Sequence, residues 1–480
     1  MTGPVRGLRA PATRDQVDAH RFGLRRLESA LVRGDAVPLH EPLRTQRRAA
    51  AGGILLAALA VAVSAAVALV APRPDWSRQA VVVGRESGAM YVVARGPDRL
   101  VPVANLVAAR LVLGALQRGG SAGGEAATAV PVVVPDEALA AAPRTAAAGV
   151  AGAESVRLDA APLPSRWAVC DEVEAGTGGR VRLTGTTVVA GAPPLAEPAG
   201  EGVLLRGPDR AVWLVAGGVR HEIDVRDGLV LATLGLTGAV ARPASAALLS
   251  ALPVGVRLSR PAIPGAGRPG PAGRTVGDVV AVRAAGGAPR AFVVLPDGLQ
   301  PVSPALAALL AGRAPREVDA VAVAGVPVVE RLDVRGWPDA APRLADLVAA
   351  PVACWTWSGE ERPQGRVLLG RAVPAPPEAR TVDLAQADGA GPLLDAVVLG
   401  GGGGPVRSVA AAGPLDSGGL ALVSETGVVH GLADADTARA LGIDAASPAP
   451  REALDLLPAG PRLDVRQAGA LVDVPVPAGG

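Results

Sequence analysis

The run AAAGGILLAALAVAVSAAVALVA, residues 49–71, decides how this 480-residue chain is organised. A helix of 23 uncharged residues, at about 1.5 Å per residue, is long enough to cross a hydrocarbon core of roughly 30 Å. Arg44, Arg47 and Arg48 precede the run, whereas Pro72 begins the segment that follows it. Because cationic flanks favour the cytoplasmic side, we predict a single-pass protein of the cytoplasmic (inner) membrane.

This anchor divides the chain into a cytoplasmic segment 1–48, a transmembrane helix 49–71 and an extracytoplasmic domain 72–480. The alternatives to a membrane anchor are a buried helix of a soluble domain and a cleaved signal peptide ending near the AVA at 66–68. A signal peptide would need an unusually long leading segment and an apolar region above the usual 7–15 residues. An uncleaved anchor is therefore favoured.

The cytoplasmic segment contains one predicted amphipathic helix within residues 13–35. Thr13 and Gln16 have the spacing of a capping box, and Gly34 stands where a helix would end. Leucines 24, 27 and 31 recur at helical spacing beside several arginines. The helix either faces solvent and lipid headgroups or docks onto another membrane subunit.

The composition excludes several function classes. The chain contains no lysine, so a Walker A phosphate loop is impossible. The GAGRPG at 265–270 lies among prolines without a following helix, and the GGSAG around Ser121 lacks the strand and helix of a nucleophile elbow. The glycine run 400–404 indicates a flexible linker. The extracytoplasmic part carries no basic patch for nucleic acid.

The histidines and cysteines offer no recognisable metal-ligand spacing. His221 and His430 are expected on the surface, on or beside strands, and no C-x-x-C or H-E-x-x-H motif occurs. We therefore predict no catalytic residue, no metal ligand and no cofactor-binding residue. A large exported region of this kind favours a scaffold over an enzyme.

Internal similarity predicts four repeats outside the membrane. The turn RGPDR occurs at 95–99 and 206–210, and LPVGVRL at 252–258 resembles LPAGPRL at 457–463. We place the repeats near 78–118, 200–258, 276–325 and 418–462, each a hairpin or small sheet with one helix. The segments between them, 160–190 and 330–395, are predicted to form a central core. These segments hold both cysteines and four tryptophans, Trp167, Trp337, Trp355 and Trp357.

Asn105 is the only asparagine in the chain. It precedes a helix-period run with Leu106, Ala109 and Leu113 on one face, where a side-chain oxygen can satisfy free amides. We predict a structural N-cap, with a ligand contact as the alternative.

Three pieces of sequence together resemble the EccB family of type VII (ESX) secretion systems in actinobacteria. They are PVANLVAARLVLG at 102–114, WAVC at 167–170, and the LPAGPRL and LPVGVRL pair. The resemblance implies a single-pass protein whose β-rich α+β extracytoplasmic domain has four strand/helix repeats around a disulfide-closed central core. One departure is GVAGAE at 149–154, where the family has a proline-containing turn.

Function and partners follow from the same resemblance. It implies a structural core subunit that links the membrane pore to the extracytoplasmic face for export of WxG-type proteins. The implied partners are EccC-, EccD- and EccE-like subunits, a mycosin-type protease and further copies of the chain. Some members have been described as ATPases, so an ATP-hydrolysing component with a non-Walker site stays as an alternative. A stand-alone extracytoplasmic sensor is another.

The two cysteines could form a metal site, a redox couple, a nucleophile with a bystander, or a cross-link. The anchor places both outside the cytoplasm, where disulfides persist. We therefore favour a Cys170–Cys354 disulfide. It would close a loop of about 185 residues, worth on the order of 5 kcal/mol in the chain-entropy model. Trp167, Trp355 and Trp357 are expected to pack beside it.

Overall fold

The computed structural model describes most of the chain in two compact units, Met1–Pro74 and Asp75–Gly480. The described residues are 12–34, 42–70, 75–96, 98–117, 123–177, 180–193, 201–283, 288–312, 315–334, 336–360, 365–385 and 394–468. The first unit holds two helices, and the second holds the sheets and every other helix among these residues.

The first unit contains α1 (Arg14–Arg33) and α2 (Pro42–Val70). Thr13 and Gln16 form the expected capping box at the start of α1, and Gly34 ends the helix with a φ of 69°. Within α2, Gln46–Val67 is long and apolar enough to cross a membrane. None of that stretch is buried against the protein, which is the exposure that a lipid-facing helix has before lipid covers it.

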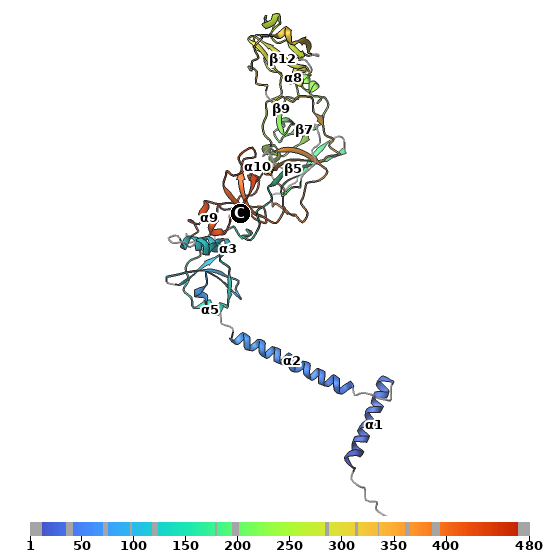
Figure 1. Ribbon diagram of the computed structural model, residues 1–480, viewed down its shortest axis with the longest axis vertical. Helices are drawn as coiled ribbons and strands as arrows, with labels where there is room; N and C mark the ends of the chain where they lie inside the picture. The colour runs from blue at the N-terminus through green and yellow to red at the C-terminus, as the bar shows by residue number, and fades with distance from the viewer. Residues whose placement is uncertain are drawn as a thin grey trace, which may run out of the picture. The chain divides into compact units, whose positions relative to one another are not determined.

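The second unit contains four repeats of one topology, named R1 to R4 in chain order (Figure 1). In each, three antiparallel strands are followed by a helix, and a fourth strand returns parallel to the first. R1 has β1 (Val81–Gly84), β2 (Met90–Ala94), β3 (Arg99–Val103), α3 (Leu106–Leu116), α4 (Gly123–Thr128), β4 (Val132–Val134) and α5 (Asp136–Ala140). R2 has β7 (Glu201–Arg206), β8 (Val212–Ala216), β9 (Val219–Ile223), α6 (Gly228–Thr233), β10 (Arg242–Pro243) and α7 (Ala246–Ala251).

R3 and R4 follow the same order. R3 has β11 (Val279–Arg283), β12 (Arg290–Leu295), β13 (Gly298–Pro301), α8 (Pro304–Ala311), β14 (Arg316–Asp319) and the 3₁₀ helix η4 (Ala320–Val323). R4 has β20 (Gly404–Val409), β21 (Leu420–Val423), β22 (Val429–Gly431), α9 (Ala435–Leu441), β23 (Ser447–Pro450) and α10 (Arg451–Leu454). Two further 3₁₀ turns are η1 (Trp76–Arg78) and η3 (Pro271–Gly273).

Two of the expected repeat boundaries are wrong. The range 78–118 ends before β4, which pairs with β1, and the range 418–462 begins after β20, which pairs with β21 and β23. The glycine run 400–404 is not a flexible linker: Gly401, Gly402 and Gly403 turn the chain with φ between 75° and 97°, and Gly404 starts β20. Only glycine adopts such a succession without strain.

A six-stranded sheet, which we call the central sheet, contacts R2 and R4. Its strand order is β17-β16-β5-β6-β19-β18. The strands are β5 (Arg166–Ala175), β6 (Val181–Ala190), β16 (Val352–Ser358), β17 (Arg366–Gly370), β18 (Arg380–Asp383) and β19 (Ala396–Leu399). The expected core segment 330–395 starts too early, because β15 (Arg343–Leu344) pairs with β7 of R2 and Trp337 packs into the R2–R3 core.

The two faces of the central sheet have different coverings. Side chains alternate along a strand, so Trp167 and Val169 share one face with Trp355 and Trp357, packed against α7 of R2 and α10 of R4. Cys170 and Cys354 lie on the opposite face with Ala168, Val189, Val352 and Val398. The expectation that the tryptophans pack beside the cysteines is therefore wrong.

The repeats are also joined in pairs by their helices. R1 and R4 share one apolar cluster through α3 and α9, which are neighbours in Figure 1, and R2 and R3 share another through α6 and α8. R2 and R4 each pack a second helix on the central sheet. The order of contact is thus R3, R2, central sheet, R4, R1.

Candidate functional site

The disulfide joins two neighbouring strands of the central sheet, β5 and β16. Cys170 on β5 and Cys354 on β16 are directly opposite each other, with their Cα atoms 4.0 Å apart. Both side chains are buried. The bond connects segments separated by 184 residues, with R2 and R3 inserted between them in sequence. It is a structural staple placed away from solvent.

The residue after Cys170 carries a buried carboxyl group that ties R2 to the central sheet from the opposite face. Asp171 Oδ1 accepts hydrogen bonds from Thr186 Oγ1 at 2.9 Å and Ser245 Oγ at 2.7 Å, and Oδ2 accepts one from the Ser245 amide at 2.7 Å. Ser245 is also the N-cap of α7. One carboxyl therefore holds β5, β6 and the helix that covers the tryptophan face.

Burial dominates the electrostatics of this cluster. Removal from water raises the pKa of Asp171 to about 6, against the lowering effect of its hydrogen bonds with Ser245 and Thr186. Burial also lowers the pKa of Arg242 to about 10, and the nearby Asp171 opposes that change. Arg242 Nη2 donates to the carbonyl of Ala350 at 2.6 Å. The cluster is a structural tie between elements, and its two charged side chains, Asp171 and Arg242, are almost completely buried.

Three repeats hold their returning chain segment with a buried polar side chain from the third strand. His221 Nδ1 is 2.9 Å from the carbonyl oxygen of Val256, and His430 Nδ1 is 3.1 Å from that of Pro461. A carbonyl only accepts, so Nδ1 carries the hydrogen in both. Gln300 does the same work in R3, with Nε2 donating to Leu332 O at 2.7 Å. We call these three side chains the clamp residues.

The expectation that both histidines lie on the surface is wrong. His221 is 2% exposed and His430 is not exposed at all. A side chain at Gly255 or Gly460 would overlap the respective ring, so each glycine lets the returning segment lie flat on an imidazole. The sequence signal was the shared glycine of LPVGVRL and LPAGPRL. At the equivalent place in R1 stands Val101, next to the bridge between Leu100 and Arg144.

Asn105 lies at the N-cap of α3. Its Oδ1 accepts a hydrogen bond from the Ala108 amide at 2.8 Å, which satisfies one of the free donors of the first turn. The helix that follows is buried along Val107, Leu111 and their neighbours against α9.

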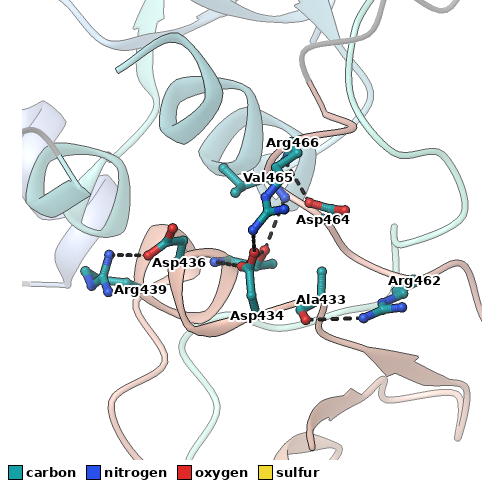
Figure 2. A network of polar contacts seen from close by, with 9 residues as sticks. Ala433, Asp434, Asp436, Arg439, Arg462, Asp464, Val465 and Arg466 are labelled. Carbon is teal, nitrogen blue, oxygen red and sulfur yellow. Dashed lines mark hydrogen bonds and ion pairs between the residues drawn. The ribbon is translucent and has the colours of Figure 1, made fainter. Parts of the chain in front are cut away.

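Polar contacts around α9 form the network drawn in Figure 2. Asp434 caps α9 by accepting from the Thr437 amide at 2.8 Å, and that backbone hydrogen bond is the main reason its pKa is held below the usual value. Arg466 Nη2 lies 3.0 Å from Asp434 Oδ2, and Arg462 donates to the carbonyl of Ala433 at 3.2 Å. Arg439 pairs with Asp436 on the outer side of the helix.

Chemistry-bearing groups are sparse in the described part of the chain. No group of three or more histidine, cysteine, aspartate or glutamate side chains there is placed to hold a metal ion. A cavity of about 570 Å³ in R3 is lined by Arg290, Gln300, Ser303, Arg331, Trp337 and other residues. Arg331 forms an ion pair with Asp297, with Nη2 2.8 Å from Oδ2. Ser121 lies outside the described residues, and GAGRPG is followed only by the three-residue η3.

Comparison with known proteins identifies the architecture. The family model described as "Type VII secretion system ESX-1, transport TM domain B" matches residues 9–476. The chain belongs to the EccB family. Its place is therefore among the core subunits of type VII secretion systems.

Relatives of the EccB family align over nearly the whole chain. A Mycobacterium tuberculosis protein named ESX-5 secretion system ATPase EccB5 is 34% identical over 96% of this chain and 93% of its own length. A Mycolicibacterium smegmatis protein named ESX-3 secretion system ATPase EccB3 is 33% identical over 94% and 89%.

Solved EccB structures agree with this fold. A chain of an intact ESX-5 inner membrane complex superposes with a TM-score of 0.67 at 30% identity, covering 99% of this chain and 98% of that one. A chain of an EccB3 dimer from the ESX-3 core complex gives 0.67 at 30% identity, covering 82% of this chain and 100% of that one.

Proposed function

We propose that this EccB-family chain is a structural subunit that joins the membrane part of an ESX-type complex to its extracytoplasmic face. The observation that carries the proposal is one chain holding both a membrane-spanning helix and a large, internally tied domain. The buried groups described above bind one element to another, which suits a scaffold. We further propose that the complex exports WxG-type proteins.

The test of export is genetic complementation. In a strain lacking this gene, WxG-type proteins should disappear from the culture filtrate and return when the full chain is supplied. Unchanged export in the deletion strain would contradict the proposal.

We propose that α1 lies in the cytoplasm and that residues 72–480 lie outside. Three arginines just before the apolar run support this orientation. Alkaline phosphatase, which is active only outside the cytoplasm, should be active when fused after Ala468 and inactive when fused before Arg14. The opposite pattern would reverse the orientation.

The proposed partners are EccC-, EccD- and EccE-like subunits, a mycosin-type protease and a second copy of this chain. The related structures support this proposal, because one is an intact ESX-5 inner membrane complex and the other is an EccB3 dimer from the ESX-3 core complex. Mild detergent extraction, affinity purification and mass spectrometry should recover these partners, and a native mass should show at least two copies. Purification of a lone monomer would argue for a stand-alone sensor.

ATP hydrolysis is a second candidate, favoured by the names of the relatives. The chain has no lysine, so any site would depend on arginines. Arg290 and Arg331 line the cavity in R3 and are the residues to test. For a purely structural subunit, phosphate release by the purified chain should stay at the background level.

A matched control separates enzyme from contaminant. Arg157 pairs with Asp159 on the surface and does not line the cavity. Phosphate release that persists in Arg290→Ala and Arg331→Ala, as in Arg157→Ala, would point to a contaminant. Release that is lost only in the cavity variants would establish hydrolysis.

A further inference from the structure

The segment 458–468 crosses R4 as a strap that is held by its backbone and ends in a turn at residues 465–468. The Val429 amide donates to Pro458 O at 2.8 Å, and the Gly460 amide donates back to Val429 O at 2.9 Å. Farther along, the Leu463 amide donates to Gly431 O at 2.9 Å. We call residues 458–468 the C-terminal strap.

The strap fills the interface between R4 and R1. Leu463, Val465 and Ala468 are at most 3% exposed and belong to the apolar cluster that contains α3 of R1. A Cβ at Gly114 on α3 would lie 2.8 Å from Val465 Cγ2 and 2.9 Å from Ala440 Cβ on α9. Because α3 has a glycine there, it packs directly on the strap and on α9 together.

Polar contacts hold the same part of the strap to α9 (Figure 2). The Val465 amide donates to Thr437 Oγ1 at 3.2 Å, and Arg466 pairs with the N-cap residue Asp434 at 3.0 Å. The Asp434 side chain is about one quarter exposed, at 26%, so this pair is partly shielded from solvent. The strap therefore depends on α9 on one side and supports α3 on the other.

Within the described residues, R1 also meets R4 directly, because α3 and α4 both pack on α9, where Ala126 and Ala129 belong to the same apolar cluster as the strap. Arg110 on α3 donates to Leu441 O at the end of α9 at 2.9 Å. R1 also has Val101 where the other repeats have a clamp residue. R2 and R4, in contrast, are packed onto the central sheet by α7 and α10.

We propose that the C-terminal strap is a latch that holds R1 against R4. When the strap leaves α9, R1 separates while the central sheet, R2 and R3 stay folded. R1 is the first repeat after the membrane helix along the chain, so the latch determines whether this repeat moves with the rest of the exported unit.

Hydrogen exchange of the full chain in detergent tests the latch. One variant ends at Arg462, which keeps the Pro461 carbonyl for His430 and removes Leu463, Val465 and Ala468. The matched control ends at Ala468. In the shorter chain, the amides of α3 should exchange roughly tenfold faster or more, whereas those of β16 and α7 should keep the rate of the control. Unchanged α3 exchange would overturn the proposal.

Two further results decide the matter. If α3 and β16 accelerate by the same factor, R1 and the central sheet open as one unit, and the latch is excluded. In the full-length chain, the double variant Val465→Ala/Arg466→Ala should accelerate α3 alone. Arg439→Ala, which removes the outer ion pair of the same helix, should leave α3 at the wild-type rate.

Discussion

At the scale of single residues, the clamp residues show how a repeat closes on itself. An imidazole in R2 and R4 and an amide in R3 perform the same task, because each offers an N–H to a carbonyl of the returning segment. Buried polar groups need such partners, since an unpaired one costs about 1–3 kcal/mol. The chemistry required at this position is a donor of the right length, and two residue types supply it.

His430→Gln should therefore keep most of the stability, whereas His430→Leu should lower the free energy of unfolding by about 1–3 kcal/mol. Leucine fills space but leaves the Pro461 carbonyl without its donor. Guanidinium unfolding of the detergent-solubilised chain at one fixed pH measures the difference. Equal loss in both variants would mean that ring packing, rather than the hydrogen bond, holds the segment.

Asp171 gives stability a pH dependence of defined sign. Its folded pKa of about 6 lies above the ordinary 3.8, so its contribution is full below pH 3.8 and is lost as the pH rises through about 6. Relative to Asp171→Asn, which cannot ionise, the wild type should lose up to about 3 kcal/mol of unfolding free energy between pH 4 and pH 7. Denaturation curves at both pH values measure the difference, and parallel changes in the two proteins would refute it.

The burial of His221 and His430 depends on contacts that are distant in sequence. Neither histidine has a recognisable partner set nearby, which favours surface positions. Both are buried by returning segments more than 30 residues away, which pair with β9 and β22. The glycines in LPVGVRL and LPAGPRL were visible, but a glycine alone does not say which ring it accommodates.

At the scale of elements, α3 illustrates what local sequence does predict. A cap, a helical period and the following loop are all short-range features of the sequence. Asn105 and the leucines after it therefore predict this helix. Asn105→Ala should reduce unfolding stability by about 1 kcal/mol, and Asn105→Asp should restore it, because aspartate accepts the same amide hydrogen bond. Thermal unfolding compares the three proteins. A stable alanine variant would show that packing on α9 alone fixes the helix.

The fourth strand of each repeat was harder to foresee. β4 and β10 have three and two residues, and each pairs in parallel with a first strand that precedes it by 36 residues or more. Nothing local in such a strand distinguishes it from loop, because its pairing follows from the helix crossover. The strand β20 is hard to recognise in the sequence because it begins at Gly404, the last residue of a glycine run that is typical of a linker.

At the scale of the whole molecule, the disulfide closes a loop of chain that runs from β5 to β16 and contains R2 and R3. The Cys170→Ala/Cys354→Ala double variant should lower the free energy of unfolding by about 5 kcal/mol in the chain-entropy model, because the closed loop spans 184 residues. Denaturant unfolding in oxidising and reducing buffer measures it. A loss below about 1 kcal/mol would show that residual structure already constrains the unfolded loop.

The two-faced central sheet makes two independent observables available in one experiment. Three of the six tryptophans, Trp167, Trp355 and Trp357, lie under α7 and α10. The disulfide lies on the other face of the same strands. Indole emission therefore responds to departure of the covering helices, and susceptibility to a thiol reductant responds to opening of the opposite side. A red shift in emission while the bond still resists reductant would reveal that the repeats leave the sheet before its strands part.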